Sequence, residues 1–165
     1  MEKFKVAVVG ATGMVGRKML QVLAERKFPV GELYPFASAK SAGSKIVWEG
    51  KEYTVLETNE ENIKKVGAQI VIMSAGGKAS GIYSPMFAAA GGIVIDNSAY
   101  WRMDDQVPLV VPEVNPEDAF KHPKGIIANP NCSTIQAMVA LAPLHKAFGI
   151  KRVIYTTFQA VSGAG

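Results

Sequence analysis

The sequence predicts an α/β fold built on a doubly wound, mostly parallel β-sheet. Apolar, strand-like segments alternate with segments of helical spacing along the chain, which is typical of repeated β–α–β units. A glycine-rich loop directly follows the first strand and opens the first amphipathic helix. Near residue 130, a polar segment again joins a short strand to a helix, and this segment contains the single cysteine.

The individual elements follow from apolar runs and from helical spacing. Runs of apolar and β-branched residues predict strands at 5–9, 33–37, 45–48, 53–56, 70–73, 93–95, 109–111, 125–128 and 153–159. The strands at 45–48 and 53–56 are expected to form a hairpin around Glu49-Gly50-Lys51. Helices are predicted at 14–27, at about 80–90 with a break at Pro85, and at 134–148 with a kink or early end at Pro143 and a stop at Gly149.

Composition and charge limit the class of protein. Hydrophobic residues make up 48% and charged residues 19% of the 165 residues, as in ordinary globular domains. The net charge is +4, but the 18 lysines and arginines form no basic run, so we expect no nucleic-acid partner. A single cysteine rules out an internal disulfide and suits a reducing compartment. Since the start shows no signal-peptide pattern and no apolar run is long enough for a membrane span, we expect a cytoplasmic protein.

The loop Gly10-Ala11-Thr12-Gly13-Met14-Val15-Gly16 predicts a dinucleotide-binding site of the Rossmann type. Glycine at its three positions permits a tight turn, close approach of the backbone to a pyrophosphate, and close packing of the helix on the strand. Free N–H groups at the helix start would face the phosphates. The candidate cofactor contacts are therefore Gly10, Thr12, Gly13, Met14, Val15 and Gly16. The spacing is a variant of the usual fingerprint, and a purely structural turn is the alternative.

The end of the second strand favours NADP over NAD. An NAD-binding chain usually places Asp or Glu about 20 residues beyond the glycines, where it binds the ribose hydroxyls. This chain has Lys40 between Ser38 and Ser41 instead, which supplies a cation and hydroxyl donors and lacks a carboxylate that would repel a 2′-phosphate. The alternative is an exposed lysine in a turn.

The segment Asn129-Pro130-Asn131-Cys132-Ser133-Thr134 predicts a nucleophile. A thiol at the start of a helix meets the positive end of the helix dipole and unpaired backbone N–H groups, and both favour the thiolate. A lone cysteine is more commonly a small buried hydrophobe, but the polar residues on both sides of Cys132 argue against simple burial.

Seven segments, spread over the whole chain, together resemble aspartate-semialdehyde dehydrogenase, the phosphorylating, NADP-dependent enzyme of lysine, threonine, methionine and diaminopimelate synthesis. They are residues 10–16, 37–43, 74–77, 96–98, 111–115, 129–134 and 159–165. In this family the cysteine thiolate attacks aspartate 4-semialdehyde, the adduct gives hydride to NADP, and phosphate cleaves the thioester to 4-aspartyl phosphate. The physiological direction is the reverse.

The resemblance implies roles for individual residues. Cys132 is the nucleophile, and Asn131 positions it or the helix start. Gln159 orients the substrate. Arg102 binds phosphate, although taken by itself it is more simply a surface arginine beside Trp101. The implied cofactor contacts also include Ser74, Ala75, Gly76, Ser162 and Gly163. Lys40 stands where an arginine is common in the family, which keeps the charge but removes a fork of donors.

The resemblance further implies that part of the enzyme is absent, because family chains are longer and use a histidine base. His145 stands 13 residues beyond Cys132 on the same predicted helix, roughly 20 Å away at 1.5 Å per residue. His122 precedes the strand that leads to Cys132 and is expected about as far away. We therefore expect an NADP-binding domain at 1–131 and the start of a truncated α+β catalytic domain at 132–165.

Such a chain should bind NADP and lack turnover by itself. The full-length protein is expected to be a homo-oligomer, and the complementary half could be present as a separate chain. Two other readings stay open. One is a non-catalytic dinucleotide-binding fragment, and the other is the related N-acetyl-glutamyl-phosphate reductase of arginine synthesis, whose glycine loop and cysteine flank differ in type.

Overall fold

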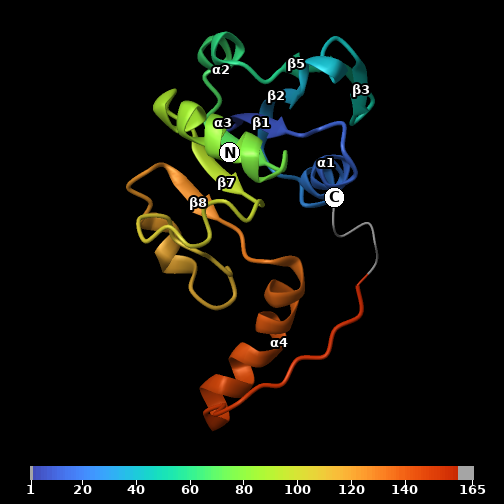
Figure 1. The fold of residues 1–165 in the computed structure, drawn as a ribbon. Helices are drawn as coiled ribbons and strands as arrows, with labels where there is room; N and C mark the ends of the chain where they lie inside the picture. Colours follow the sequence, from blue (N-terminus) through green and yellow to red (C-terminus); the bar gives the residue numbers. More distant parts are fainter. Residues whose placement is uncertain (1, 160–165) are drawn as a thin grey trace.

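The computed structural model describes residues 2–159 and confirms the predicted α/β fold (Figure 1). Six strands form one sheet in the order β5-β2-β1-β6-β7-β8, and every neighbouring pair is parallel. The strands are β1 (Phe4–Val9), β2 (Val30–Ala37), β5 (Leu56–Glu57), β6 (Ile70–Met73), β7 (Ile93–Asp96) and β8 (Ile126–Ala128). Because β2 and β6 flank β1 on opposite sides, the chain winds outward in both directions from the first strand.

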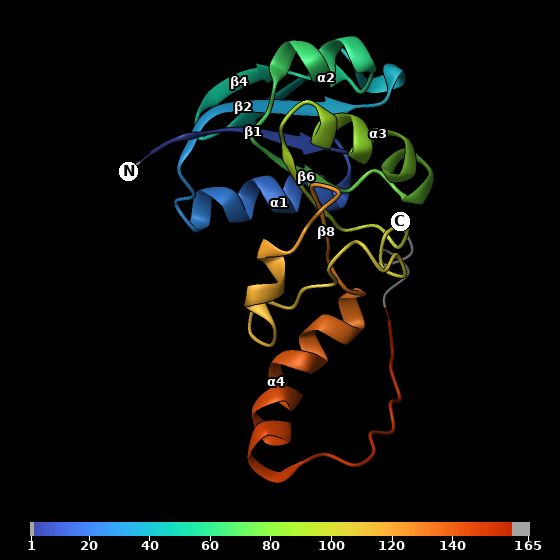
Figure 2. The same ribbon diagram turned by 90° about the vertical axis from the view of Figure 1, so that its left-hand side faces the viewer.

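Helices cover both faces of this sheet, as the doubly wound prediction requires. Helix α1 (Met14–Glu25) lies on one face, and α2 (Glu60–Val66) and α3 (Gly77–Ala89) lie on the other (Figure 2). Alternate residues of β1 accordingly belong to two cores: Val6 and Val8 pack with α1, whereas Ala7 and Val9 pack with the α2–α3 side. All four are completely buried, which is typical of a central parallel strand.

Helix α2 was missed in the sequence, although its ends have clear caps. The side chain of Asn59 accepts a hydrogen bond from Asn62 N at 2.9 Å, and Gly67 ends the helix with a left-handed φ of 55°. Only two of its residues, Ile63 and Val66, are buried. With seven residues, the helix is too short to show a repeated apolar stripe.

The predicted hairpin is present, with its second strand shifted two residues toward the turn. Strands β3 (Lys45–Trp48) and β4 (Lys51–Thr54) pair antiparallel, and Glu49 and Gly50 both have positive φ, as a type I′ turn requires. Leu56, expected in the hairpin, instead belongs to β5 and pairs with Phe36 of the main sheet.

Two predicted strands are wrong. At 109–111 only Leu109 forms a bridge, to Ala128, and residues 150–159 have no regular secondary structure. Both runs are rich in β-forming residues, but a strand also needs a neighbour that pairs its backbone N–H and C=O groups. Among residues 2–159, no segment pairs with 153–159.

The prolines interrupt the helices less than predicted. Helix α3 continues through Pro85, and α4 (Cys132–Phe148) continues through Pro143 to a left-handed Gly149. Each proline removes one backbone hydrogen bond, which these helices tolerate. Helix α4 projects away from the sheet and has no buried residue (Figures 1 and 2). Within the described part of the chain, no helix has both the length and the apolar character needed to cross a membrane.

One ion pair ties the loop after β7 to the entrance of β8, and it predicts a pH dependence. Lys124 Nζ lies 2.5 Å from Asp104 Oδ2, and this contact, followed by the Gln106 N–H, holds the pKa of Asp104 below its ordinary value. A lowered folded-state pKa stabilises the fold above the unfolded value, about 3.9, and this contribution is lost as the pH falls through the folded value.

We therefore expect Asp104→Asn to lower the urea midpoint of unfolding at pH 7, and this difference from the unchanged chain should shrink below about pH 4. Urea titrations at pH 7, 5, 4 and 3 would measure it. The matched control is Asp105→Asn, which removes an exposed neighbouring carboxylate. A difference that is constant at all four pH values would contradict the assignment.

Candidate active site

The loops that follow the parallel strands meet at one edge of the sheet. At each step, the first N–H of a loop donates to a carbonyl at the end of the adjacent strand. These bonds are Gly10 N to Phe36 O (2.8 Å), Ser74 N to Val9 O (2.9 Å), Asn97 N to Met73 O (2.9 Å) and Asn129 N to Asp96 O (2.7 Å). The glycine loop, the Ser74 segment, the Asn97 turn and the cysteine segment therefore start from one continuous edge.

The glycine loop lies at the point where the strand order reverses, between β1 and β6. Gly10 has a φ of 84°, and a Cβ there would stand 2.2 Å from the Ser74 carbonyl oxygen. A Cβ on Gly16 would stand 2.1 Å from Gly10 O. Both glycines are thus required by packing of the loop itself, in addition to any contact with a ligand.

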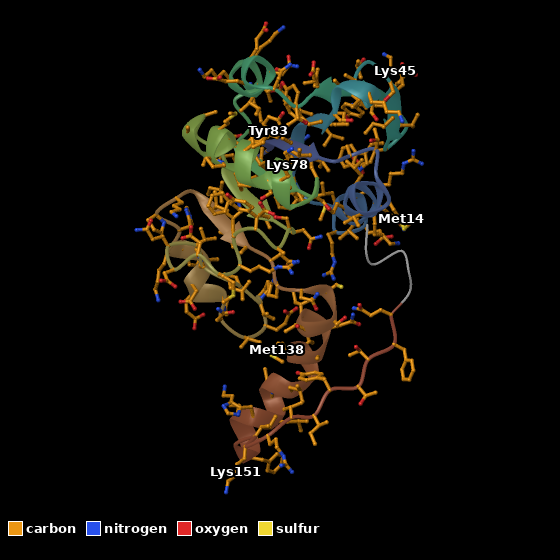
Figure 3. The ribbon with its side chains drawn as sticks, viewed as in Figure 1. Met14, Lys45, Lys78, Tyr83, Met138 and Lys151 are labelled. Carbon is orange, nitrogen blue, oxygen red and sulfur yellow. The ribbon has the colours of Figure 1, made fainter. Side chains whose placement is uncertain are left out.

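The start of α1 fits the phosphates of a dinucleotide. Gly13 is the N-cap and has no side chain to satisfy the first N–H groups of the helix. Gly13 is exposed, and Met14, labelled in Figure 3, is 72% exposed at the same helix end. Val15 is also exposed, whereas Thr12 is half-buried and accepts Arg17 Nε at its carbonyl.

The other predicted cofactor residues lie along the same edge. A short 3-10 helix, Ala39–Ser41, follows β2 and presents Lys40 to solvent beside Ser38 and Ser41. None of the ion pairs found among residues 2–159 involves Lys40. Ser74, Ala75 and Gly76 form the loop between β6 and α3. Ser162 and Gly163 lie outside the described residues.

Cys132 is the first residue of α4, and its side chain is exposed. Asn131 is the N-cap of this helix: its Oδ1 accepts Ser133 N at 3.0 Å and Thr134 N at 3.2 Å. The cap fixes the backbone of the first helical turn, and the Cys132 side chain stays exposed to solvent.

Two residues distant in sequence meet this segment. Gln159 Nε2 lies 3.9 Å from Cys132 Sγ and also donates to the Ser133 hydroxyl. Arg102, which is half-buried, donates through Nε to Asn129 O at 2.9 Å and through Nη2 to Asn97 O at 3.1 Å. Arg102 is therefore tied to the loop that leads to Cys132, unlike a free surface arginine.

Three buried polar residues beside the site were missed in the sequence. The Asp96 carboxylate accepts hydrogen bonds from the hydroxyls of Ser80 and Ser84 on α3, and all three side chains are completely buried. The signal was the Asp96-Asn97-Ser98 segment, which the resemblance included without a role for Asp96. In the described residues no group of three His, Cys, Asp or Glu side chains is placed to hold a metal ion.

This geometry defines a dinucleotide-binding α/β domain with a thiol at the same sheet edge, and comparison with known proteins gives the family. Residues 5–122 match the family model described as semialdehyde dehydrogenase, NAD binding domain. The chain belongs to the semialdehyde dehydrogenase family.

Its relatives carry the more specific name. Aspartate-semialdehyde dehydrogenase of Aquifex aeolicus is 60% identical over 98% of this chain and 48% of the relative. The crystal structure of aspartate semialdehyde dehydrogenase II of Vibrio cholerae superposes with a TM-score of 0.92 at 49% identity, over 99% of this chain and 49% of that one. A second structure of that protein, complexed with ASA, has a TM-score of 0.85 at 48% identity, over 91% and 49% of the two chains.

A more distant structure contains a cofactor. Aspartate semialdehyde dehydrogenase of Candida albicans, solved with NADP, has a TM-score of 0.73 at 29% identity, over 90% of this chain and 48% of that one. The chain spans about half the length of the relatives it matches. The recognition of this family from the seven sequence segments is therefore confirmed.

The glycine loop gives a direct test of the packing argument. Gly16→Ala should destabilise the chain by about 1–3 kcal/mol, because its Cβ would press on backbone atoms that cannot rotate away. It should also weaken dinucleotide binding, since α1 must shift. Thermal melting and cofactor titration would measure both effects. Gly77→Ala is the matched control: its Cβ meets nothing within 4 Å, so the same change should be neutral or slightly stabilising.

Proposed function

We propose that this chain forms the cofactor-binding and nucleophile-bearing part of an NADP-dependent aspartate-semialdehyde dehydrogenase. The reaction is the reductive dephosphorylation of 4-aspartyl phosphate to aspartate 4-semialdehyde. The observation that carries the proposal is the exposed Cys132 thiol, which lies at the start of α4, 3.9 Å from Gln159 Nε2, at the sheet edge that holds the glycine loop. Residues 1–131 are the cofactor domain, and 132–165 begin the catalytic domain.

The chemistry starts at sulfur. Cys132 Sγ, as the thiolate, attacks the acyl carbon of the substrate, and expulsion of phosphate leaves a thioester on the cysteine. Asn131 holds the helix start that bears the thiol, and Gln159 can donate Nε2–H to the substrate beside it. When bound, NADPH would supply the hydride to the thioester carbon, and cleavage of the carbon–sulfur bond would release the aldehyde and return Cys132 as the thiolate. Its phosphates fit the uncapped start of α1.

Arg102 suits the phosphate of the substrate. Its Nε and Nη2 are bonded to the carbonyls of Asn129 and Asn97, and Nη1 has no hydrogen bond within the described structure. A guanidinium held in this way keeps donors for an oxyanion, with its orientation already fixed.

The proton transfers require a general base within reach of the Cys132 thiol, and neither histidine of the chain lies there. His145 lies in the last turn of α4, and its Nδ1 accepts Ile150 N at 3.2 Å. His122 precedes β8, whereas Cys132 follows that strand. General-base catalysis needs hydrogen-bond reach or one bridging water. We therefore propose that a complementary half of the protein supplies the base. We also propose that the complete protein is a cytoplasmic homo-oligomer.

A chimera tests this proposal. This chain would be joined to the part of the Aquifex aeolicus relative that follows the matched segment. We expect phosphate-dependent reduction of NADP⁺ by aspartate 4-semialdehyde in the chimera, measured by absorbance, and none from this chain by itself. Cys132→Ser in the chimera should abolish turnover, because a hydroxyl is a much weaker nucleophile.

The outcomes separate the alternatives. Turnover by this chain alone would refute the argument from the histidines. Turnover by the Cys132→Ser chimera would remove the thiol from the mechanism. Preference for N-acetylglutamate semialdehyde would favour the arginine-pathway reductase, and dinucleotide binding without turnover in the chimera would favour a non-catalytic module.

Cofactor choice is a separate prediction. Lys40→Ala should raise the Kd for NADP⁺ about tenfold and leave the Kd for NAD⁺ unchanged, because the lysine is proposed to contact the 2′-phosphate, which only NADP has. Isothermal titration of both cofactors measures the ratio. Lys51→Ala, at an exposed lysine of the hairpin, is the control. Equal losses for NADP⁺ and NAD⁺ would contradict a role in selectivity.

A further inference from the structure

Asp96 is a completely buried carboxylate at the end of β7. Its Oδ2 accepts the hydroxyls of Ser80 and Ser84, the latter at 2.9 Å, and its Oδ1 accepts Ser98 N at 2.6 Å. Among the ion pairs between described residues, none involves Asp96.

A completely buried carboxyl group without a cationic partner is costly to remove from water, and an apolar side chain would close the end of a strand at lower cost. Three hydrogen bonds offset part of this cost. They also join three elements to one side chain: α3 through two serines, β7 through Asp96 itself, and the turn after β7 through Ser98. The carboxylate therefore fixes where this turn lies relative to α3.

The turn is shaped by two local bonds in succession. Asp96 Oδ1 accepts the N–H two residues ahead, and Ser98 Oγ then accepts Tyr100 N at 3.2 Å. Arg102 follows two residues later. The path from Asp96 to the guanidinium is short and restrained at both Ser98 and Tyr100.

The same turn is joined to the cysteine loop from two directions. Asn97 Oδ1 accepts Asn129 Nδ2 at 2.7 Å. Arg102 bridges the two loops by donating to the carbonyls of Asn97 and Asn129. Asn129 precedes Cys132 by three residues. Displacement of the Asn97 turn would thus move both the arginine and the loop that bears the thiol.

We infer that Asp96 is a positioning residue, which holds the Arg102 guanidinium, through the 97–102 turn, against the loop that leads to Cys132. This inference rests on the proposed function, in which Arg102 binds the anionic group that Cys132 displaces. It assigns Asp96 a task that a purely structural buried polar group would not have: loss of the carboxylate should weaken the action of Arg102 on anions that approach the thiol.

Two alkylating reagents measure that action without any turnover. Iodoacetate is anionic and iodoacetamide is neutral, and both attach to the same thiolate with loss of iodide. The ratio of their rate constants cancels the thiolate fraction and reports the positive charge near sulfur. In the 165-residue chain, Arg102→Gln should lower this ratio about fivefold, as expected for one unit charge at short range.

The decisive variant is Asp96→Ala, which should lower the ratio nearly as far as Arg102→Gln. Asp96→Asn should restore most of it, since the amide oxygen still accepts Ser98 N–H and the amide NH₂ can donate to the serine hydroxyls. Should Asp96→Ala fail to fold by circular dichroism, Ser84→Ala removes one of the hydroxyl donors and should give an intermediate ratio. Trp48→Phe is the structural control, because it removes a buried hydrogen bond to Leu20 O on the distant side of the domain.

The ratio of the two alkylation rate constants decides whether Asp96 positions Arg102 or has a purely structural role. A fall in Asp96→Ala, recovery in Asp96→Asn and no change in Trp48→Phe support positioning. A ratio in Asp96→Ala equal to that of the unchanged chain overturns it, as does an unchanged ratio in Arg102→Gln. Failure of the proposed function would appear separately, as absent turnover in the chimera, since alkylation needs neither cofactor nor substrate.

Discussion

The candidate site depends on the parallel pairing of six strands, because this pairing places the carboxyl ends of all strands at one edge. The hydrogen-bond ladder continues one residue into each of four loops, from Gly10, which follows β1, to Asn129, which follows β8. The starts of these loops are therefore as fixed as the strands themselves. A glycine loop and a thiol that lie more than a hundred residues apart in sequence can meet a common ligand only through this edge.

The buried residues of the described chain all precede Cys132, and the helix that begins there is uncovered. Five of the six sheet strands, all except β5, contain buried residues, and β1 contributes four residues with no exposed surface. Helix α4 has no buried residue, and apolar side chains such as Phe148 and Phe158 are 83% and 97% exposed. Cys132 stands at the boundary, where a rigid scaffold ends and an uncovered helix begins. A nucleophile at such a boundary can be positioned by the cofactor domain and still be open to groups from another part of the protein.

Local structural elements could be predicted from the sequence, whereas contacts between residues distant in the chain could not. The hairpin around Gly50 follows from neighbouring residues, although its second strand lies two residues nearer the turn than predicted. The helix near the cysteine is also present, and it begins at Cys132, two residues earlier than predicted. The strand expected at 153–159 has the right composition, but strand formation depends on a partner that composition cannot reveal. The Asp96 network was missed for the same reason: its donors Ser80 and Ser84 stand 16 and 12 residues away, on a helix that looks merely small and apolar.

The contacts of Arg102 show what the fold adds to the role that the resemblance implies for it. In sequence it is one arginine beside a tryptophan, whereas in the structure it bridges two loops through their backbone carbonyls. These carbonyls are present whatever the side chains at 97 and 129, so no residue pattern announces them. A lysine would keep the positive charge, but its ammonium on a flexible stem lacks the planar fork of a guanidinium. It could not bind both carbonyls and still keep donors for an anion. The backbone geometry at this sheet edge, which presents two carbonyls to one side chain, therefore suits an arginine at this position.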